Sequence, residues 1–98
     1  MDDYVFQWDL SKADINLQKH GVSFDEAKTV FSDSLARLVN DPDSSYGEER
    51  FIILGESSLS RLLVVCHCYR GSDNIIRLIS ARKADKRERK VYEGFKHA

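Results

Sequence analysis

The chain has 98 residues, 42% of them apolar and 10% aromatic, and its 15 Lys and Arg nearly balance its 16 Asp and Glu, for a formal net charge of -1. This composition excludes an intrinsically disordered chain, and this length holds one domain, residues 1–98. The longest unbroken apolar run, Leu62 to Cys66, is too short to span a membrane, and the acidic opening MDDYVFQWD has no apolar segment typical of a secretion signal. We therefore expect a cytoplasmic protein with no membrane partner.

The first third of the chain predicts two short helices, after a possible N-terminal strand. The segment SKADINLQKHG has the pattern of a helix that Ser11 caps and Gly21 stops. The next segment, VSFDEAKTVF, repeats the pattern, with Ser23 as N-cap and Glu26 at the third helical position. Together they predict a helix pair with a joint of one or two residues.

The rest of the chain predicts strands followed by one helix. The apolar segments 35–41, 50–56, 61–69 and 75–82 are separated by polar turns that predict hairpin connections. Asp85 can cap a final helix, with Glu88 at the third position. Helices segregated from consecutive strands indicate an α+β domain: an antiparallel β-sheet with two N-terminal helices and a C-terminal helix. In the last strand, alternation places residues 76, 78, 80 and 82 on one face.

Positive charge is concentrated in the second part of the chain. Residues 1–60 hold 5 Lys and Arg against 12 Asp and Glu, whereas residues 61–98 hold 10 against 4, and six of the nine residues 82–90 are basic. This asymmetry favours a polyanionic partner for the basic part. Pairing of acidic and basic segments within the fold explains it equally well, so both interpretations stay open.

Two cysteines, Cys66 and Cys68, flank His67 in the third predicted strand. Residues two apart on a strand have Cα atoms about 6.5 Å apart, at the long limit for a disulfide, so we expect free, half-buried thiols. His67 should face the opposite side, and no second ligand pair follows at zinc spacing, so we predict no metal site. The chain also lacks a glycine-rich phosphate loop and a Gly-x-Ser-x-Gly elbow, and we predict no cofactor.

The polar residues of the strands and basic helix are of the types that RNA cleavage requires. A base takes the 2'-hydroxyl proton, an acid protonates the leaving 5'-oxygen, and cations stabilise charge on the phosphate. His and Glu suit the first two roles and Arg the third. The alternatives are a packed structural histidine and a solvated basic helix. The candidates for this chemistry are His67, Glu49, Arg50, Arg77 and Arg82.

Three stretches, FQWDLSKADINLQKHGVSFDEAKTVFSD, GEERFIILGES and IIRLISARKADKRERKVYE, together resemble the BrnT family of toxins from bacterial type II toxin-antitoxin pairs. The resemblance implies a RelE-like fold and an endoribonuclease that halts translation and growth. It also implies a cognate BrnA-like antitoxin with a ribbon-helix-helix part, contact with operator DNA only through the toxin-antitoxin complex, and a homodimer as one option within that complex.

The matching motifs name further candidate residues. Glu49 and Arg50 match a Glu-Arg pair, and His67, Arg77 and Arg82 fall in the C-terminal motifs. Two positions depart from the family pattern: Gln7 replaces a common Glu, and Cys68 stands where Thr is usual. The resemblance leaves two rivals open, a non-catalytic antitoxin-binding co-repressor and a ParE-like toxin that acts on a protein such as gyrase. The expected substrate-binding residues are Lys19, His20, Arg70, Ser80, Lys83, Lys86, Arg87 and Arg89.

Overall fold

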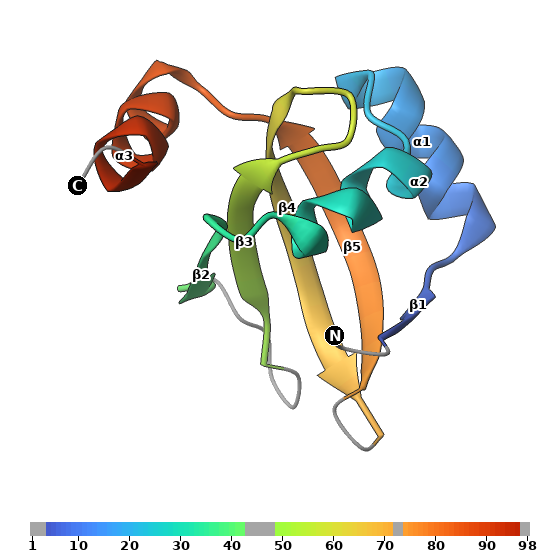
Figure 1. Ribbon diagram of the computed structural model, residues 1–98. Helices are drawn as coiled ribbons and strands as arrows, with labels where there is room; N and C mark the ends of the chain where they lie inside the picture. Colours follow the sequence, from blue (N-terminus) through green and yellow to red (C-terminus); the bar gives the residue numbers. More distant parts are fainter. Residues whose placement is uncertain (1–3, 43–48, 72–73, 97–98) are drawn as a thin grey trace.

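The computed structural model describes residues 4–42, 49–71 and 74–96. It has the expected α+β architecture, with two helices before the main strands and one after them (Figure 1). In chain order the elements are β1 (Val5–Gln7), α1 (Leu10–His20), α2 (Phe24–Ala27), the 3-10 helix η1 (Lys28–Ser32), β2 (Arg37–Asn40), β3 (Phe51–Glu56), β4 (Leu62–Arg70), β5 (Ile75–Lys83) and α3 (Lys86–Lys96).

The five strands form one sheet in the order β1-β5-β4-β3-β2. The four strands from β2 to β5 pair antiparallel with their neighbours, as hairpin connections require. The N-terminal strand β1 pairs parallel with β5, with Val5 opposite Ile75, so the complete sheet is mixed. The expected antiparallel sheet is therefore present and gains one parallel strand at its edge.

A bulge interrupts the pairing of β4 with β5. His67 lies opposite Leu78, but its neighbour Cys66 lies opposite Ser80, so Ile79 is an extra residue on β5. A bulge of this kind exchanges the faces to which the following side chains point. Its position decides which side of the sheet carries the polar end of β5.

The bulge corrects the predicted alternation along β5. Ile76, Leu78 and Ala81 all belong to the core beneath α1, although Leu78 and Ala81 are three residues apart. Ser80 and Arg82 consequently point to the other side of the sheet. The prediction that they share a face with Ile76 and Leu78 is wrong, because regular alternation ends at Ile79.

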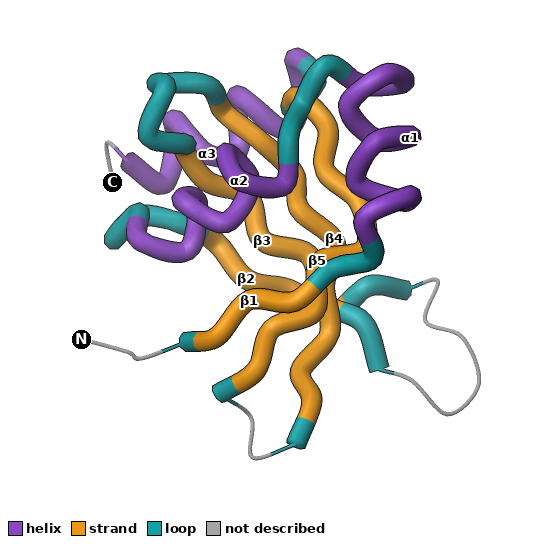
Figure 2. Tube along the Cα trace, turned by 90° about the vertical axis from the view of Figure 1, so that its right-hand side faces the viewer, coloured by secondary structure: helices purple, strands orange, loops and turns teal. Residues whose placement is uncertain are grey.

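Helices cover the two faces of the sheet unequally. We call the side beneath α1, α2 and η1 the α1 face, and the opposite side the α3 face; Figure 2 shows α1 and α2 lying over the same side of the strands. On the α3 face, α3 is anchored by Tyr92, which is buried against Leu54, Leu62 and Val64. Its hydroxyl donates a 2.7 Å hydrogen bond to Asp33. Most of the buried core lies on the α1 face: Val22, Phe24, Ala27, Val30, Ile53, Leu63, Val65, Ile76, Leu78 and Ala81.

Local hydrogen bonds fix the helix ends. Asp9, not Ser11 as predicted, caps α1: its Oδ1 accepts from the backbone N–H groups of Ser11 at 2.9 Å and Lys12 at 3.1 Å. Two residues that can cap a helix lie close together here, and the earlier one adds two residues to the helix. Gly21 ends α1 in the left-handed conformation (φ 69°), and Ser23 caps α2, both as predicted.

Asn16 ties α1 to the bulged part of β5. Its side-chain Nδ2 donates to the backbone carbonyls of Val22 and Ala81, each at 2.9 Å, and its Oδ1 accepts from the N–H of Ala81 at 3.0 Å. Strand β1 ends at Gln7 and does not reach this part of β5. The amide therefore supplies the hydrogen bonds that a neighbouring strand would otherwise make.

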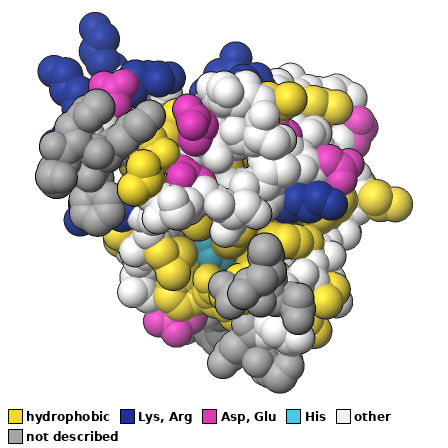
Figure 3. Space-filling view, in the orientation of Figure 1, with side chains coloured by type: hydrophobic (Ala, Val, Ile, Leu, Met, Phe, Trp, Pro, Cys, Tyr) yellow, Lys and Arg dark blue, Asp and Glu magenta, His cyan; other side chains and the backbone are white. Residues whose placement is uncertain are grey.

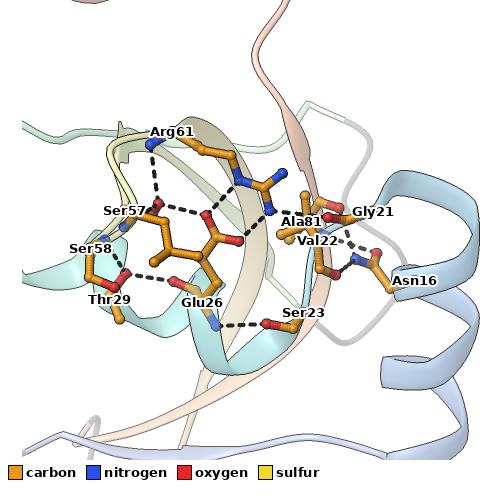
Figure 4. Close-up of polar contacts among 11 residues, drawn as sticks. Asn16, Gly21, Val22, Ser23, Glu26, Thr29, Ser57, Ser58, Arg61 and Ala81 are labelled. Atoms are coloured by element: carbon orange, nitrogen blue, oxygen red, sulfur yellow. Dashed lines mark hydrogen bonds and ion pairs between the residues drawn. The ribbon is translucent and has the colours of Figure 1, made fainter.

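An ion pair between Glu26 and Arg61 holds the start of α2 against the β3–β4 turn (Figure 4). The Glu26 carboxylate accepts from Nε and Nη2 of Arg61 and from the hydroxyl of Ser57, the last at 2.7 Å. Arg61 also donates to the carbonyl of Gly21 at 3.1 Å. The hydrogen bond from Arg61 is the main cause of the lowered pKa of Glu26. These contacts fix the α1–α2 corner relative to the sheet.

Candidate functional site

A groove on the α3 face brings together three of the predicted site residues, Arg50, Ser80 and Arg82. Its volume is about 340 Å³. The three residues converge because Arg50 immediately precedes β3, while the bulge turns Ser80 and Arg82 toward this side. The remaining lining residues are Asp41, Ile52, Val64, Cys66 and Ile79.

The guanidinium of Arg82 is held by Glu88 at the start of α3. Nη1 and Nη2 donate to the two carboxylate oxygens of Glu88, each at 2.8 Å. Glu88 also accepts from the N–H of Asp85, and Asp85 accepts from the N–H of Glu88, both at 2.8 Å, so the predicted capping box of α3 is present. The hydrogen bond with Arg82 is the main cause that lowers the pKa of Glu88 to about 2. Glu88 is therefore ionised at neutral pH.

Asp41 and Cys66 lie in the same groove. The Cys66 thiol donates a hydrogen bond to Oδ2 of Asp41 at 3.5 Å. Burial, followed by this hydrogen bond, raises the pKa of Cys66 to about 11, so the thiol stays protonated at neutral pH. Because the thiolate is the nucleophilic form, Cys66 is a poor nucleophile here. Asp41 contributes a carboxylate to the lining of the groove.

Two further predicted arginines lie along the strands on either side of a turn. Arg77 is paired with Cys68. Its side chain lies on the α3 face, as that of Cys66 does, and it is about 7 Å from Cys66 along the direction of the strands. Arg70 is exposed at the end of β4, about 20 Å along the strand from the position opposite Arg82. Arg77 is thus within reach of a polymer bound in the groove, whereas Arg70 is at the other end of the sheet.

The basic residues of α3 form an exposed surface beside the groove. In Figure 3, Lys and Arg side chains (dark blue) gather around α3 at the upper left. Lys86, Arg87 and Arg89 are exposed on this helix. Lys83 is exposed as well, but it lies opposite Leu63 on the α1 face, the reverse of Arg82. The expected basic surface is therefore split by the sheet, with the α3 residues on the groove side.

His67 lies on the opposite face of the sheet from the groove. It has no exposed surface and packs edge-on against Phe31 and Tyr69. Its Nδ1 is 3.3 Å from the carbonyl of Val65, which can only accept, so Nδ1 carries the proton; Nε2 is 3.3 Å from the Tyr69 hydroxyl. Burial lowers the pKa of His67 to about 4. In this conformation His67 is a neutral core residue that a substrate in the groove does not touch.

The other predicted residues also lie outside the groove lining. Glu49 is exposed and accepts a 3.0 Å hydrogen bond from the Asn40 side chain. Lys19 and His20 form the last turn of α1, which packs on the α1 face. The sequence motif that contains them has a structural role, since Gly21 ends the helix and its carbonyl accepts a hydrogen bond from Arg61.

Sequence reasoning missed Asp41, Cys66 and Glu88 as parts of this site. Cys66 alternates with His67 along the strand, which did place it on the opposite face. Asp41 follows a predicted strand, a position where polar residues often line sites, but its distance of 25 residues from Cys66 carries no signal. Glu88 was recognised only as a helix-capping residue. Its second role depends on the bulge that turns Arg82 toward α3.

With this geometry established, comparison with known proteins gives the family. The family model for the ribonuclease toxin BrnT of type II toxin-antitoxin systems matches residues 8–88. The chain belongs to the BrnT family. BrnT proteins are ribonuclease toxins, and a type II system supplies each toxin with a protein antitoxin as its partner.

Similarity to a solved structure supports the fold of this BrnT chain. The crystal structure of the Brucella abortus ribonuclease toxin BrnT matches it with a TM-score of 0.61 and 22% sequence identity, covering 88% of this chain and 100% of the other. At this identity the match shows a shared fold. No curated protein sequence matches the chain. In the described parts of the chain, every helix is too short or too polar to cross a membrane.

Proposed function

We propose that this BrnT chain is an endoribonuclease that cleaves RNA without a metal ion and thereby inhibits translation. The observation that carries the proposal is the groove on the α3 face, where Arg50, Ser80 and Arg82 meet. A guanidinium matches the oxygens of a phosphate with two parallel hydrogen bonds. Two arginines and a hydroxyl in one groove therefore suit the phosphate backbone of RNA.

Cleavage proceeds by attack of a 2'-oxygen on the adjacent phosphorus. The bond from phosphorus to the 5'-oxygen breaks, which leaves a 2',3'-cyclic phosphate and a free 5'-hydroxyl. Asp41 is the base that accepts the 2'-hydroxyl proton, because its carboxylate lines the groove; the exposed Glu49 is the alternative base. Arg82 and Arg50 stabilise the charge that develops on the phosphate, and a proton reaches the leaving oxygen from water.

Neighbouring basic residues extend the binding surface along the RNA. Arg77 lies on the same face of the sheet and binds the next phosphate. Lys86, Arg87 and Arg89 on α3 contribute favourable long-range attraction. His67 has a structural role, because it is buried on the other face. Lys19, His20, Arg70 and Lys83 remain peripheral contacts for a longer RNA.

The protein partner is an antitoxin with a ribbon-helix-helix part that binds operator DNA. The exposed cations of α3 offer it a docking surface for acidic residues, so antitoxin and RNA compete for the same side of the molecule. Both partners are found in the cytoplasm, where we place the toxin. Within the toxin-antitoxin complex, a homodimer of the toxin is one possible arrangement.

The test is incubation of the purified protein with end-labelled RNA in buffer containing EDTA. The proposal predicts fragments that end in 2',3'-cyclic phosphate, at the same rate with and without EDTA. Growth arrest in cells whose RNA stays intact would instead support action on a protein such as gyrase. Folded protein that binds antitoxin but neither cuts RNA nor arrests growth would support the co-repressor function.

A further inference from the structure

Beside the groove, an ion pair joins Arg82, on β5, to Glu88, on α3. Both guanidinium Nη atoms are bound by the carboxylate at 2.8 Å, in the bidentate arrangement that fixes the plane of the guanidinium. The pair is partly sheltered, with 43% of the Arg82 side chain and 27% of the Glu88 side chain exposed. An arginine this accessible would otherwise sample many rotamers.

The hydrogen bonds of Arg82 leave one edge of the guanidinium available. A guanidinium has five N–H donors. Glu88 takes one from each Nη, and the carbonyl of Lys83 accepts a further one from Nη1 at 3.3 Å. Within the described residues, the Nε–H and the second N–H of Nη2 are the two donors that remain. They form the side-on fork of the guanidinium, which can bind two phosphate oxygens while Glu88 stays in place.

Glu88 is itself fixed from two sides. Its carboxylate accepts from the N–H of Asp85, which closes the capping box at the start of α3. Farther along the helix, Tyr92 is 5% exposed and bonds to Asp33 beside β2 and β3. The position of Glu88 is therefore set by the packing of α3 and not by Arg82 alone.

We infer that Glu88 is a positioning residue, which holds the guanidinium of Arg82 with its side-on edge ready for the scissile phosphate. This inference rests on the proposed function of the groove. It gives α3 a second role in the reaction. The exposed cations of α3 attract RNA, whereas its acidic residue Glu88 orients the guanidinium of Arg82, which binds the phosphate. Preorganised donors are worth more in a transition state than mobile ones.

The variant that isolates this role is Glu88→Gln. Glutamine also suits the third position of a capping box, so the start of α3 is preserved. Its amide offers one oxygen to Arg82 and turns an NH2 donor toward the second Nη, so the bidentate clamp is lost. Two matched controls separate the effects: Asp85→Ala removes the helix cap and leaves the clamp, and Glu93→Gln removes a negative charge from an exposed position of the same helix.

The measurement is kcat and KM for cleavage of a short RNA, together with the thermal midpoint of each variant. We expect Glu88→Gln to lower kcat about tenfold with no increase in KM, because the orientation of Arg82 is lost while the local positive charge around α3 rises. Both controls should keep kcat within about twofold. A Glu88→Gln variant with the kcat of wild type, or an equal loss in Glu93→Gln, would overturn the inference.

A second readout does not depend on cleavage. In NMR spectra of 15N-labelled protein, the Arg82 Nε–H should give one resolved signal, which shifts and exchanges more slowly with water when a DNA oligonucleotide, which cannot be cleaved at a 2'-oxygen, is added. In Glu88→Gln the signal should broaden and the shift on DNA addition should weaken. If wild type cuts no RNA, the proposed function fails while this readout still tests the positioning role. An Arg82 signal that is unaffected by Glu88→Gln or by DNA would contradict it.

Discussion

Removal of Arg61 should destabilise the fold more than removal of its partner Glu26. The Glu26 side chain is 5% exposed, whereas the Arg61 side chain is 32% exposed. Arg61→Ala leaves a buried carboxylate whose remaining side-chain partner is the Ser57 hydroxyl. Glu26→Ala leaves a cation that can turn toward water and still reach the carbonyl of Gly21. The asymmetry follows from which charge stays buried.

The magnitudes follow from that difference in burial. An ion left buried without its partner costs about 3–5 kcal/mol, and the partial exposure of Arg61 places Arg61→Ala near the lower end, about 3 kcal/mol. Glu26→Ala should cost about 1.5–2 kcal/mol, the lower end of the range for hydrogen bonds to charged groups, because the Arg61 guanidinium that remains can be solvated by water. In a domain of this size, each kcal/mol lowers the thermal midpoint by about 4–8 °C.

The assay is urea denaturation of both variants, with Arg87→Ala at an exposed position as the control, which should stay within about 0.5 kcal/mol of wild type. A pH series adds a second test. Because the folded-state pKa of Glu26 is lowered, its stabilisation is complete above pH 4.5 and is lost as pH falls through the folded pKa. Arg61→Ala should flatten this acid loss. Destabilisation by Arg61→Ala smaller than that by Glu26→Ala would refute the reasoning.

Three further predictions concern other buried contacts. Because the folded-state pKa of His67 is about 4 against 6.5 in the unfolded chain, stability should fall by up to about 3 kcal/mol between pH 6.5 and 4, and His67→Leu should remove this dependence in urea titrations at several pH values. Asn16→Leu should cost about 2–4 kcal/mol, because it leaves the backbone of Ala81 without partners, and hydrogen exchange of the Ala81 amide should accelerate; unchanged exchange would contradict this role. Gly55→Ala should cost about 1–3 kcal/mol in thermal unfolding, since its new Cβ would lie 2.8 Å from Cγ1 of Val30, and an unchanged midpoint would show that the contact relaxes freely.

Features set by nearby residues could be predicted from the sequence. Ser23 caps α2, Gly21 ends α1, and Asp85 forms a capping box with Glu88. Each of these depends on residues no more than a few positions apart, so the pattern contains the information. The strand segments and the opposite orientation of Cys66 and His67 follow from the two-residue period in the same way.

Features set by distant contacts could not be predicted. Nothing in IIRLISAR marks Ile79 as an extra residue, because the segment has no Gly or Pro and both registers bury apolar side chains. The bulge is supported by Asn16, which binds Ala81 from 65 residues away. The parallel pairing of β1 with β5 also joins distant residues.

The geometry of the candidate site was the hardest feature to predict, because it depends on such distant contacts. Regular alternation would put Arg77 and Arg82 on opposite faces of the sheet; the bulge puts both on the α3 face, with Ser80 between them. The bulge also places Arg82 and His67 on opposite faces of the sheet, although the sequence suggested that His67 acts together with Arg82 in catalysis. Residue types thus predicted the kind of chemistry, and the bulge decided which residues can act together.

The most direct test of the proposed site compares single-turnover RNA cleavage by Arg82→Ala and by His67→Leu, with Lys12→Ala on α1 as a matched loss of one cation. We predict that Arg82→Ala loses about 100-fold or more in rate, while His67→Leu and Lys12→Ala, once shown to be folded, stay within about threefold of wild type. A folded His67→Leu variant that loses as much activity as Arg82→Ala, or an Arg82→Ala variant as active as wild type, would contradict the assignment of the reaction to the groove on the α3 face.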